Sequence, residues 1–503
     1  MRKLELAGRT RLLLFLLLSP LLNAREARAE NLVRTGQCSI DFVENSGLSA
    51  AALQPNALVQ AIADFIANTK ANLAVAAHDL DHPVIVTALL DAAARGVLVR
   101  VFTDSKDSLS DVLNGSRGEE YYRALSRRIV LEQLRRGLDG AIGTADDVFL
   151  QADAPIEALE GPTKIRLRNQ LPSTARDVPR HTYYSGRRLF NDTAVLARGM
   201  LKEPLQANNI PEYYAPGSSR MHHKFMVADG RSVLTGSYNF TVSGAEGSTF
   251  DRAVGAELGH RQHLLTIENV EIAGGYLRAF DSLWGGSGSA SDDAARLREP
   301  VAGHFDFMSL SCGFPISVAF LPNPTAIHYV SERLSHARRS IYFEFFSFTH
   351  VELIKKIYER GVGSGVGVHG LIDARFYPLF RAQAESLGGD VLDFFEGSST
   401  DDARIEKSRL YRLLHTKTLI VDGLEAEAVV ITGSANFSET AFESNRENIL
   451  FLNSQVVALA FTKSVLRFAA ANRVNRETYC PAVWDRGVEE SEHASAIGVS
   501  EED

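Results

Sequence analysis

The sequence is short of several features that would place a protein in a class at once. Only three of its 503 residues are cysteines, and no Cys-x-x-Cys pair or Cys/His spacing indicates a metal centre. Beyond the N-terminus no run of about eighteen apolar residues occurs, so no further membrane span is expected. The formal net charge is −9, so nucleic acid binding would need a local basic channel. The composition is typical of a soluble globular protein, and the length predicts two or more domains.

The N-terminus carries the one long apolar run. Residues 12–22, "LLLFLLLSPLL", are too short to span a bilayer, and a basic segment precedes them. Ala27 and Ala29 form an A-x-A cleavage pattern, so we expect 1–29 to be a signal peptide and the protein to be secreted or periplasmic. An uncleaved anchor is the alternative. Residues 1–29 hold six Lys/Arg and two Asp/Glu, so cleavage would change the formal net charge from −9 to −13.

The cysteines are Cys38, Cys312 and Cys480. Export favours one disulfide and leaves one thiol over, because disulfides persist in oxidising compartments. Cys312 and Cys480 flank the second half of the chain, so we predict that pair. Three buried free thiols are the alternative.

The chain repeats itself. Residues 71–104 read as strand, helix and strand, and residues 339–373 repeat that order, with Gly361 expected to end the second helix. Each copy is followed by an apolar hairpin pattern, at 222–241 and 415–438, and then by a strand and a helix. We predict an α/β fold with a first half at 30–285, a linker at 286–304, a second half at 305–484 and an acidic tail at 485–503.

The first half is longer than the second. Its additional residues, at about 105–215, exceed an ordinary connection and suggest a lid or specificity element. Within them "GLDGAIGTADDV" (137–148) resembles an acidic cation loop. It lacks the residue order of an EF-hand, so we expect an Asp/Gly turn and no bound metal.

The two hairpin patterns carry the same polar residues. Both contain His-x-Lys-x4-Asp followed by Gly-Ser-x-Asn, and two copies are hard to obtain by chance. Imidazole, ammonium, hydroxyl and carboxamide groups that converge would bind a phosphate anion. The aspartates each precede a glycine and have a structural alternative as hairpin turns. The candidate site residues are His222, Lys224, Asp229, Ser237 and Asn239 in the first half and His415, Lys417, Asp422, Ser434 and Asn436 in the second.

These motifs resemble those of the phospholipase D superfamily. The resemblance covers roughly 35–285 and 305–480, without the 105–215 insert. It implies two similar α/β sandwich halves that pack as a pseudo-dimer, with both motifs at one cleft. It also implies that one histidine attacks phosphorus to give a phosphohistidine while the other protonates the leaving alcohol. Two lysines would then supply the charge that metal ions give other phosphodiesterases, so no cofactor is expected.

In this family a carboxylate commonly follows each motif and binds its histidine. The second half has Glu447, whereas alignment of the two halves places Gln262 at that position in the first, with Asp251 as a rival. We predict that Gln262 orients a neutral His222 as the nucleophile. We predict that Glu447 favours protonated His415 as the general acid.

The motif does not choose the substrate. We predict an exported, monomeric phospholipase D-type enzyme that hydrolyses or transfers the phosphatidyl group, with possible peripheral membrane contact. An exported metal-independent endonuclease is the alternative, since "KIRLRNQ" (164–170) and "RHTYYSGRR" (180–188) interleave basic and other side chains. A catalytically inactive phosphate-binding module is the third hypothesis.

Overall fold

The computed structural model describes 30–45, 56–104, 130–131, 134, 137–139, 144–152, 221–246, 259–284, 306–397, 404–408 and 413–474. The predicted signal peptide, linker and acidic tail, and most of the 105–215 insert, lie outside the described residues. In the part of the chain that is described, no helix is both long and apolar enough to cross a membrane.

The first half is built on an eight-stranded mixed sheet with the order β1-β2-β8-β7-β6-β3-β4-β5. β3 and β4 are parallel, and the β6–β7 hairpin joins β3 in antiparallel pairing. Its described elements are β1 (Glu30–Arg34), β2 (Ser39–Glu44), α2 (Ala57–Asn68), β3 (Asn72–Ala77), α3 (Pro83–Ala94), β4 (Leu98–Thr103), β5 (Phe149–Ala152), β6 (Lys224–Ala228), β7 (Ser232–Gly236), α8 (Val242–Glu246), β8 (His263–Glu268) and α10 (Val270–Leu283).

The second half repeats this topology in the order β9-β10-β16-β15-β14-β11-β12-β13. Its described elements are β9 (Phe307–Ser309), β10 (Ile316–Phe320), α12 (Ala326–Ser335), β11 (Ser340–Phe345), α13 (Val351–Ser364), β12 (Gly367–Ile372), α14 (Tyr377–Leu387), α15 (Gly389–Glu396), β13 (Ile405–Lys407), β14 (Lys417–Val421), β15 (Val429–Gly433), α16 (Glu439–Glu443), β16 (Asn448–Leu452) and α17 (Gln455–Val474). The predicted duplicated α/β fold is confirmed.

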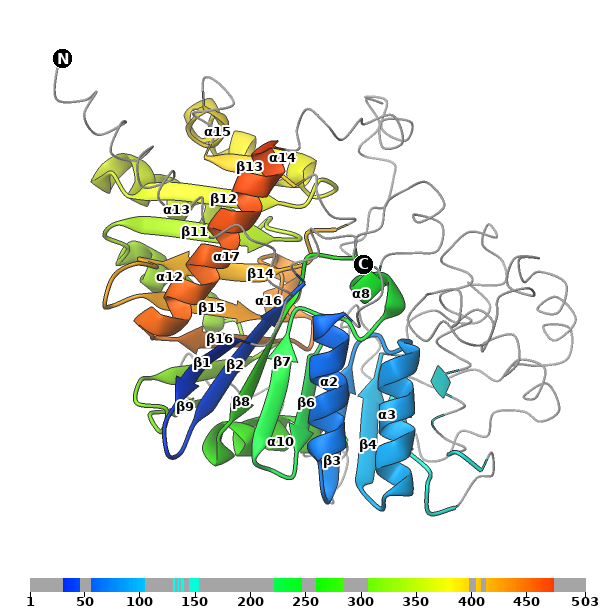
Figure 1. The fold of residues 1–503 in the computed structure, drawn as a ribbon. Coiled ribbons are helices and arrows are strands. Elements are labelled where there is room, and N and C mark those ends of the chain that lie inside the picture. Colours follow the sequence, from blue (N-terminus) through cyan, green and yellow to red (C-terminus); the bar gives the residue numbers. More distant parts are fainter. Residues whose placement is uncertain are drawn as a thin grey trace, which may run out of the picture.

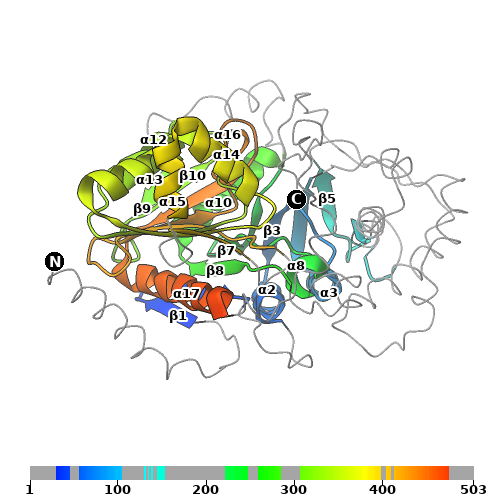
Figure 2. The same ribbon diagram turned by 90° about the horizontal axis from the view of Figure 1, so that it is seen from above.

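Each sheet is covered on both faces (Figures 1 and 2), because alternate residues of its strands are apolar on both sides. In β3, Leu73 and Val75 pack in the core under α2 and α3, whereas Ala74 and Ala76 face a second core. That second core includes side chains of α10 and α17 and of both sheets, so it joins the halves. α12, α13, α14 and α15 cover the other face of the second sheet (Figure 2).

The helix ends follow local sequence signals, with one exception. Asn56 and Asn269 cap α2 and α10 through their side-chain oxygens, and α3 begins at Pro83. The prediction that Gly361 ends the second repeat's helix is wrong. α13 continues to Ser364 and ends at Gly365, which has φ 64° in the left-handed region that glycine tolerates.

Part of the predicted insert belongs to the sheet. β5 lies within 105–215 and pairs in parallel with β4, as β13 pairs with β12 in the second half. The larger length difference therefore falls between β5 and Met221, where the second half has only 408–413. The described part of "GLDGAIGTADDV" is a turn in which Leu138 and Asp139 donate backbone N–H groups to Asp146.

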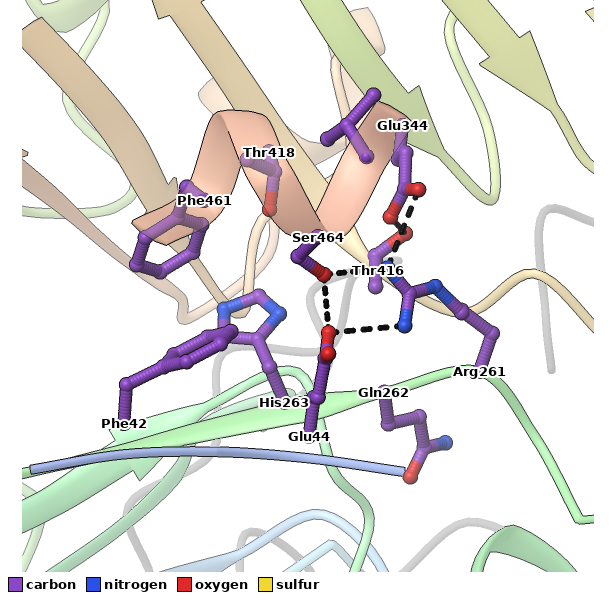
Figure 3. Close-up of a pocket in the computed structure, with 11 residues that line it drawn as sticks. Phe42, Glu44, Arg261, Gln262, His263, Glu344, Thr416, Thr418, Phe461 and Ser464 are labelled. Atoms are coloured by element: carbon purple, nitrogen blue, oxygen red, sulfur yellow. Dashed lines mark hydrogen bonds and ion pairs between the residues drawn. The ribbon is translucent and has the colours of Figure 1, made fainter. Parts of the chain in front are cut away.

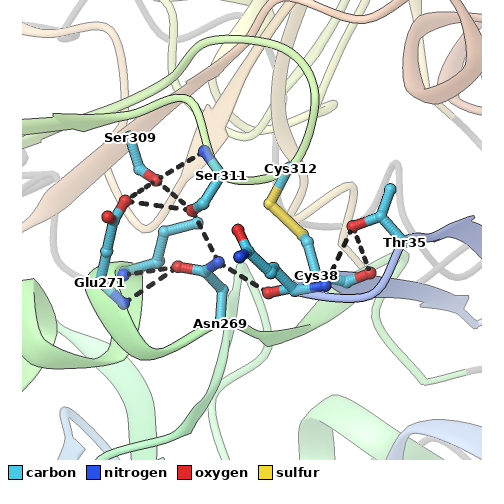
Figure 4. Close-up of a disulfide and its surroundings, with 9 residues drawn as sticks. Thr35, Cys38, Asn269, Glu271, Ser309, Ser311 and Cys312 are labelled. Atoms are coloured by element: carbon cyan, nitrogen blue, oxygen red, sulfur yellow. Dashed lines mark hydrogen bonds between the residues drawn. A yellow bond between two sulfur atoms is a disulfide. The ribbon is translucent and has the colours of Figure 1, made fainter.

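The disulfide joins the two halves. Cys38 is bonded to Cys312, and both are buried (Figure 4), so the predicted Cys312–Cys480 pair is wrong. Cys480 lies outside the described residues. The β1–β2 and β9–β10 connections lie side by side where the halves pack, although 274 residues separate the two cysteines in sequence. Flanking positions in sequence carry no information on such a contact.

Candidate active site

The two histidine motifs meet at the boundary between the halves. His222 donates its backbone N–H to Arg446 O at 3.0 Å, and His415 donates its own to Arg261 O at 2.9 Å. Parallel bridges between Met221 and Arg446 and between Arg261 and Leu414 extend both contacts. Each motif is therefore hydrogen-bonded to the other half. His222 binds the segment before β16, and His415 binds the segment before β8.

This crossing reverses the predicted partners of the histidines. His222 Nδ1 lies 2.6 Å from Glu447 Oε1, and His415 Nδ1 lies 3.1 Å from the side-chain amide of Gln262. The prediction that Gln262 serves His222 and Glu447 serves His415 is therefore wrong. Alignment of the halves identified both residues, but each reaches across the boundary because the segments before β8 and β16 pair with the opposite motif. Asp251 lies outside the described residues.

Both lysines are fully buried beside their own histidines. Lys224 Nζ donates to His222 O at 2.7 Å, and Lys417 Nζ donates to His415 O at 2.9 Å. Burial lowers the pKa of Lys417 well below its usual range, and the charge of Lys224 lowers it further. Two ammonium groups that oppose each other's charge in a buried site are stabilised by an anion between them.

The Gly-Ser-x-Asn segments hold the second edge of the site. The hydroxyls of Ser237 and Ser434 accept the backbone N–H of the first residue of β8 and of β16, at 3.1 and 2.9 Å. Only glycine fits at position 236, because a Cβ atom there would lie 2.3 Å from the carbonyl oxygen of His263. Asn239 and Asn436 are buried, and their Oδ1 atoms have no hydrogen-bond partner among the described residues.

The assignment of the motif aspartates as catalytic is corrected by their contacts. Asp229 accepts the backbone N–H groups of Lys70, Ala71 and Asn72 at 2.8–2.9 Å. Asp422 does the same for residues 338–340. Each aspartate lies beyond the far end of a five-residue strand from its lysine, roughly 15 Å away at the usual rise per residue. Both have positive φ, so the structural alternative, a hairpin turn, is confirmed.

The imidazoles lie in a buried, positive environment. Burial lowers the pKa of His222 and of His415 well below the usual value, and the two buried lysines lower both further. Burial has the opposite effect on Glu447 and raises its pKa to about 8. Because His222 and Glu447 lie 2.6 Å apart, they titrate as one coupled pair.

One functional candidate escaped the sequence analysis. The ring of His78 meets that of His222 edge-on, with centroids 4.6 Å apart. Its Nδ1 lies 3.1 Å from Met221 O and 3.4 Å from Asp104 Oδ2. The segment "HDLDHP" (78–83) at the end of β3 could have indicated this residue, because the second half has no histidine at the position of His78. The rings against His415 are those of Phe346 and His260, with centroids 5.1 and 5.9 Å away.

The arrangement provides the groups that phosphodiester cleavage requires. The Nε2 atom of His415 has no partner among the described residues, and Ser237 O accepts from its Nδ1 at 3.0 Å. The two imidazoles and the two ammonium groups lie close enough to lower the pKa of both histidines. A phosphate anion here would raise the pKa of both histidines by opposing the field of the lysines. In the described residues, no group of three or more His, Cys, Asp or Glu is placed to hold a metal.

Comparison with known proteins places both motifs in one sequence family. The family described as "Cardiolipin synthase, PLD-like domain" matches residues 62–284 and 330–468, which is more than half of the chain. A phospholipase D of Rickettsia conorii is 24% identical over 174 residues, covering 34% of this chain and 76% of that protein. A mitochondrial cardiolipin hydrolase of Xenopus laevis is 31% identical over 81 residues, covering 16% of this chain and 33% of that protein.

Two solved structures resemble the chain in fold. The phosphatidylserine synthase of Haemophilus influenzae covers 89% of this chain and matches over 89% of its own, with 11% identity and a TM-score of 0.47. Nuc, a phospholipase D family member from Salmonella typhimurium, covers 31% of this chain and matches over 93% of its own, with 23% identity and a TM-score of 0.24.

Proposed function

This chain belongs to the phospholipase D-like family of phosphodiesterases, and we propose that it cleaves or transfers the phosphatidyl group of phospholipids through a phosphohistidine. One observation carries the proposal. The two histidines are held by partners from opposite halves, so a single buried site is assembled from both motifs. Because one chain supplies both motifs, we propose that the monomer is active.

His222 is the nucleophile in this proposal, for a reason that differs from the sequence prediction. Glu447 accepts the Nδ1 proton and leaves Nε2 for attack on phosphorus. As the P–N bond forms, the imidazole becomes positive, and a carboxylate at 2.6 Å stabilises that charge, as in other carboxylate–imidazole pairs. Gln262 carries no charge to offer its histidine.

His415 is the general acid. Its Nδ1 donates to Ser237 O, so its Nε2 is directed to the leaving oxygen. The nearby Gln262 Nε2 is itself a donor and offers no acceptor to the imidazolium, which is therefore a stronger acid than one beside a carboxylate. When the P–O bond breaks, the alcohol takes the Nε2 proton. His415 then removes a proton from water or a second alcohol, which attacks phosphorus and breaks the P–N bond to restore His222.

Phospholipid is the proposed substrate. The relatives are named for phospholipase D and cardiolipin hydrolase activities, and both names describe cleavage of lipid phosphodiesters. The acidic net charge also weighs against phosphate-rich duplexes. The basic segments that would favour a nuclease, 164–170 and 180–188, lie outside the described residues.

Export remains part of the proposal. The N-terminal pattern of 1–29 supports it, and so does the Cys38–Cys312 bond, because disulfides persist in oxidising compartments. Peripheral contact with a membrane surface would then bring the site to its substrate.

The substrate is tested directly with the purified mature protein. Vesicles of phosphatidylcholine, phosphatidylethanolamine and cardiolipin are compared with single- and double-stranded DNA, all in the presence of a chelator. We expect headgroup release from at least one lipid and none in the His222→Ala variant. Cleavage of DNA without lipid turnover would favour the endonuclease. Phosphate-ester binding without any turnover would favour the inactive binding module.

A further inference from the structure

A second buried polar cluster surrounds Arg261 where the two halves meet (Figure 3). The guanidinium of Arg261 contacts Glu44 at 3.0 Å, Glu344 at 3.3 Å and the hydroxyl of Ser464 at 2.6 Å. Glu44 and Arg261 belong to the first half, whereas Glu344 in β11 and Ser464 in α17 belong to the second. Only about 5% of the Arg261 side chain is exposed, so its charge depends on these partners.

The cluster is connected to His415 on both sides. Arg261 donates its backbone N–H to Leu413 O at 2.8 Å and accepts that of His415 at 2.9 Å. The residue after Arg261 is Gln262, whose amide contacts the His415 ring. The residue after His415 is Thr416, whose hydroxyl donates to Glu344 at 3.4 Å. A shift of the guanidinium would therefore be transmitted to the imidazole through short, stiff links.

Comparison of equivalent positions in the two halves shows that this cluster is not a general feature of the fold. Arg446 occupies the position of Arg261, because it precedes Glu447 and binds the backbone of His222. The positions of the two acids differ. Asn45 donates its backbone N–H to Gln262 O, and Leu321 donates its own to Glu447 O, so these two residues occupy equivalent positions. The residues before them therefore also correspond, Glu44 to Phe320. By strand register Glu344 corresponds to Ala76.

We propose that Arg261, held by Glu44 and Glu344, is a positioning residue that fixes the His415 ring for protonation of the leaving group. This inference rests on the proposed role of His415 as general acid. The corresponding positions near Arg446 hold Phe320 and Ala76, which carry no charge, and the anchoring of His222 comes from the direct contact with Glu447. The histidine with a neutral partner thus receives its support through the backbone instead.

Substitutions that keep the cluster folded are needed for the test. Arg261→Lys keeps the charge but loses the two-pronged contact. Glu344→Gln removes one charge and keeps the shape, so it gives a second route to the answer if Arg261→Lys does not fold. Arg467→Met is the matched control, because Arg467 contacts Glu44 at 2.9 Å from the solvent side and its side chain is 58% exposed.

The readout is the dependence on leaving group. Rates of phosphohistidine formation are measured by rapid quench with two phosphodiesters, one releasing an alkyl alcohol and one releasing p-nitrophenol, which needs no proton. We expect Arg261→Lys and Glu344→Gln to slow the alkyl substrate by about 10–100-fold, as other supporting contacts do. The p-nitrophenyl substrate should be affected far less, and Arg467→Met should leave both rates unchanged.

Two results would overturn the proposal. An equal loss with both substrates would mean that the cluster only maintains the fold, and no loss in either folded variant would mean that it does not act on His415. The His415→Ala variant separates this from failure of the proposed function. If His415→Ala shows no dependence on leaving group, the assignment of the acid is wrong, whatever the cluster variants do.

Discussion

The two halves share one strand order and one set of motifs, but they surround their histidines with different groups. His222 contacts the carboxylate of Glu447, whereas His415 contacts the neutral amide of Gln262. The scaffold that delivers these partners is symmetric, since Gln262 and Glu447 occupy equivalent places before β8 and β16. At the two histidines the asymmetry therefore lies in the side chains, on an equivalent backbone.

The rings beside the histidines differ in the same way. His78 lies against His222, and Phe346, which follows β11 as His78 follows β3, lies against His415. At this position a titratable ring can adjust the charge of its neighbour, whereas a phenyl ring can only pack against it. The titratable ring near His415, that of His260, comes from another segment, with its centroid 5.9 Å away. Exchanging the rings of His78 and Phe346 is therefore a second way to test how the halves differ.

The largest expected effect tests what the halves have in common. Lys224→Met and Lys417→Met should each lower kcat roughly 10²–10³-fold or more, because each removes a buried cation from the phosphorane charge. Steady-state kinetics would measure this, with exposed Lys70→Met as the control. A near-normal kcat in either variant would show that its half does not contribute to the site.

The next test transposes the asymmetry. Glu447→Gln should slow phosphohistidine formation roughly 10–100-fold, because the charge on His222 loses its carboxylate. The double variant Glu447→Gln/Gln262→Glu should move the phosphoryl label from His222 to His415. Mass spectrometry of quenched, digested enzyme locates the label. Label that stays on His222 in the double variant would mean that the partners do not set the roles.

Exchange of the neighbouring rings should have a smaller effect, visible in the pH profile. The positive charge of His78 lowers the pKa of His222, so His78→Phe should raise that pKa. Since His222 attacks only when neutral, the acidic limb of kcat/KM should move to higher pH. The other groups acting on His222 are unchanged: Lys224, Lys417, His415 and Glu447.

The reciprocal change, Phe346→His, adds a second titratable ring beside His415, whose pKa is already lowered by Lys417, His260 and Lys224. Its charge would lower the pKa of His415, so the basic limb should move to lower pH. A uniform fall in rate with unmoved limbs in both variants would show that the rings only fill space.

The smallest expected effect on catalysis concerns the bond between the halves. Cys38→Ser should leave kcat near normal but lower the free energy of unfolding by about 2–4 kcal/mol, because the disulfide closes a long loop. Thermal unfolding with and without a reductant measures this. Cys480→Ser is the control, and an equal loss of stability there would support the Cys312–Cys480 pairing instead.

The sequence by itself determined the repeat, the two sheets and the identity of most site residues. Strand periodicity, Pro83 and the Asp229–Gly230 turn are local signals, so they predict local structure. Repetition of the motif pointed to a phosphate site, and alignment of the halves found Gln262 and Glu447. The sequence could not predict that His78 contacts His222, because a lone histidine after a strand can have many different neighbours.

Only the tertiary structure decided which groups meet. Glu447 reaches His222, Gln262 reaches His415, and Cys38 reaches Cys312, each across the boundary between the halves. Asp229 and Asp422 lie outside the site for a local reason, since a strand carries each to the end opposite its lysine. The physical reason is that hydrogen bonding and periodicity along a segment are encoded locally. Contacts between halves depend on how two sheets pack, and in a duplicated chain the motif alone is compatible with either pairing.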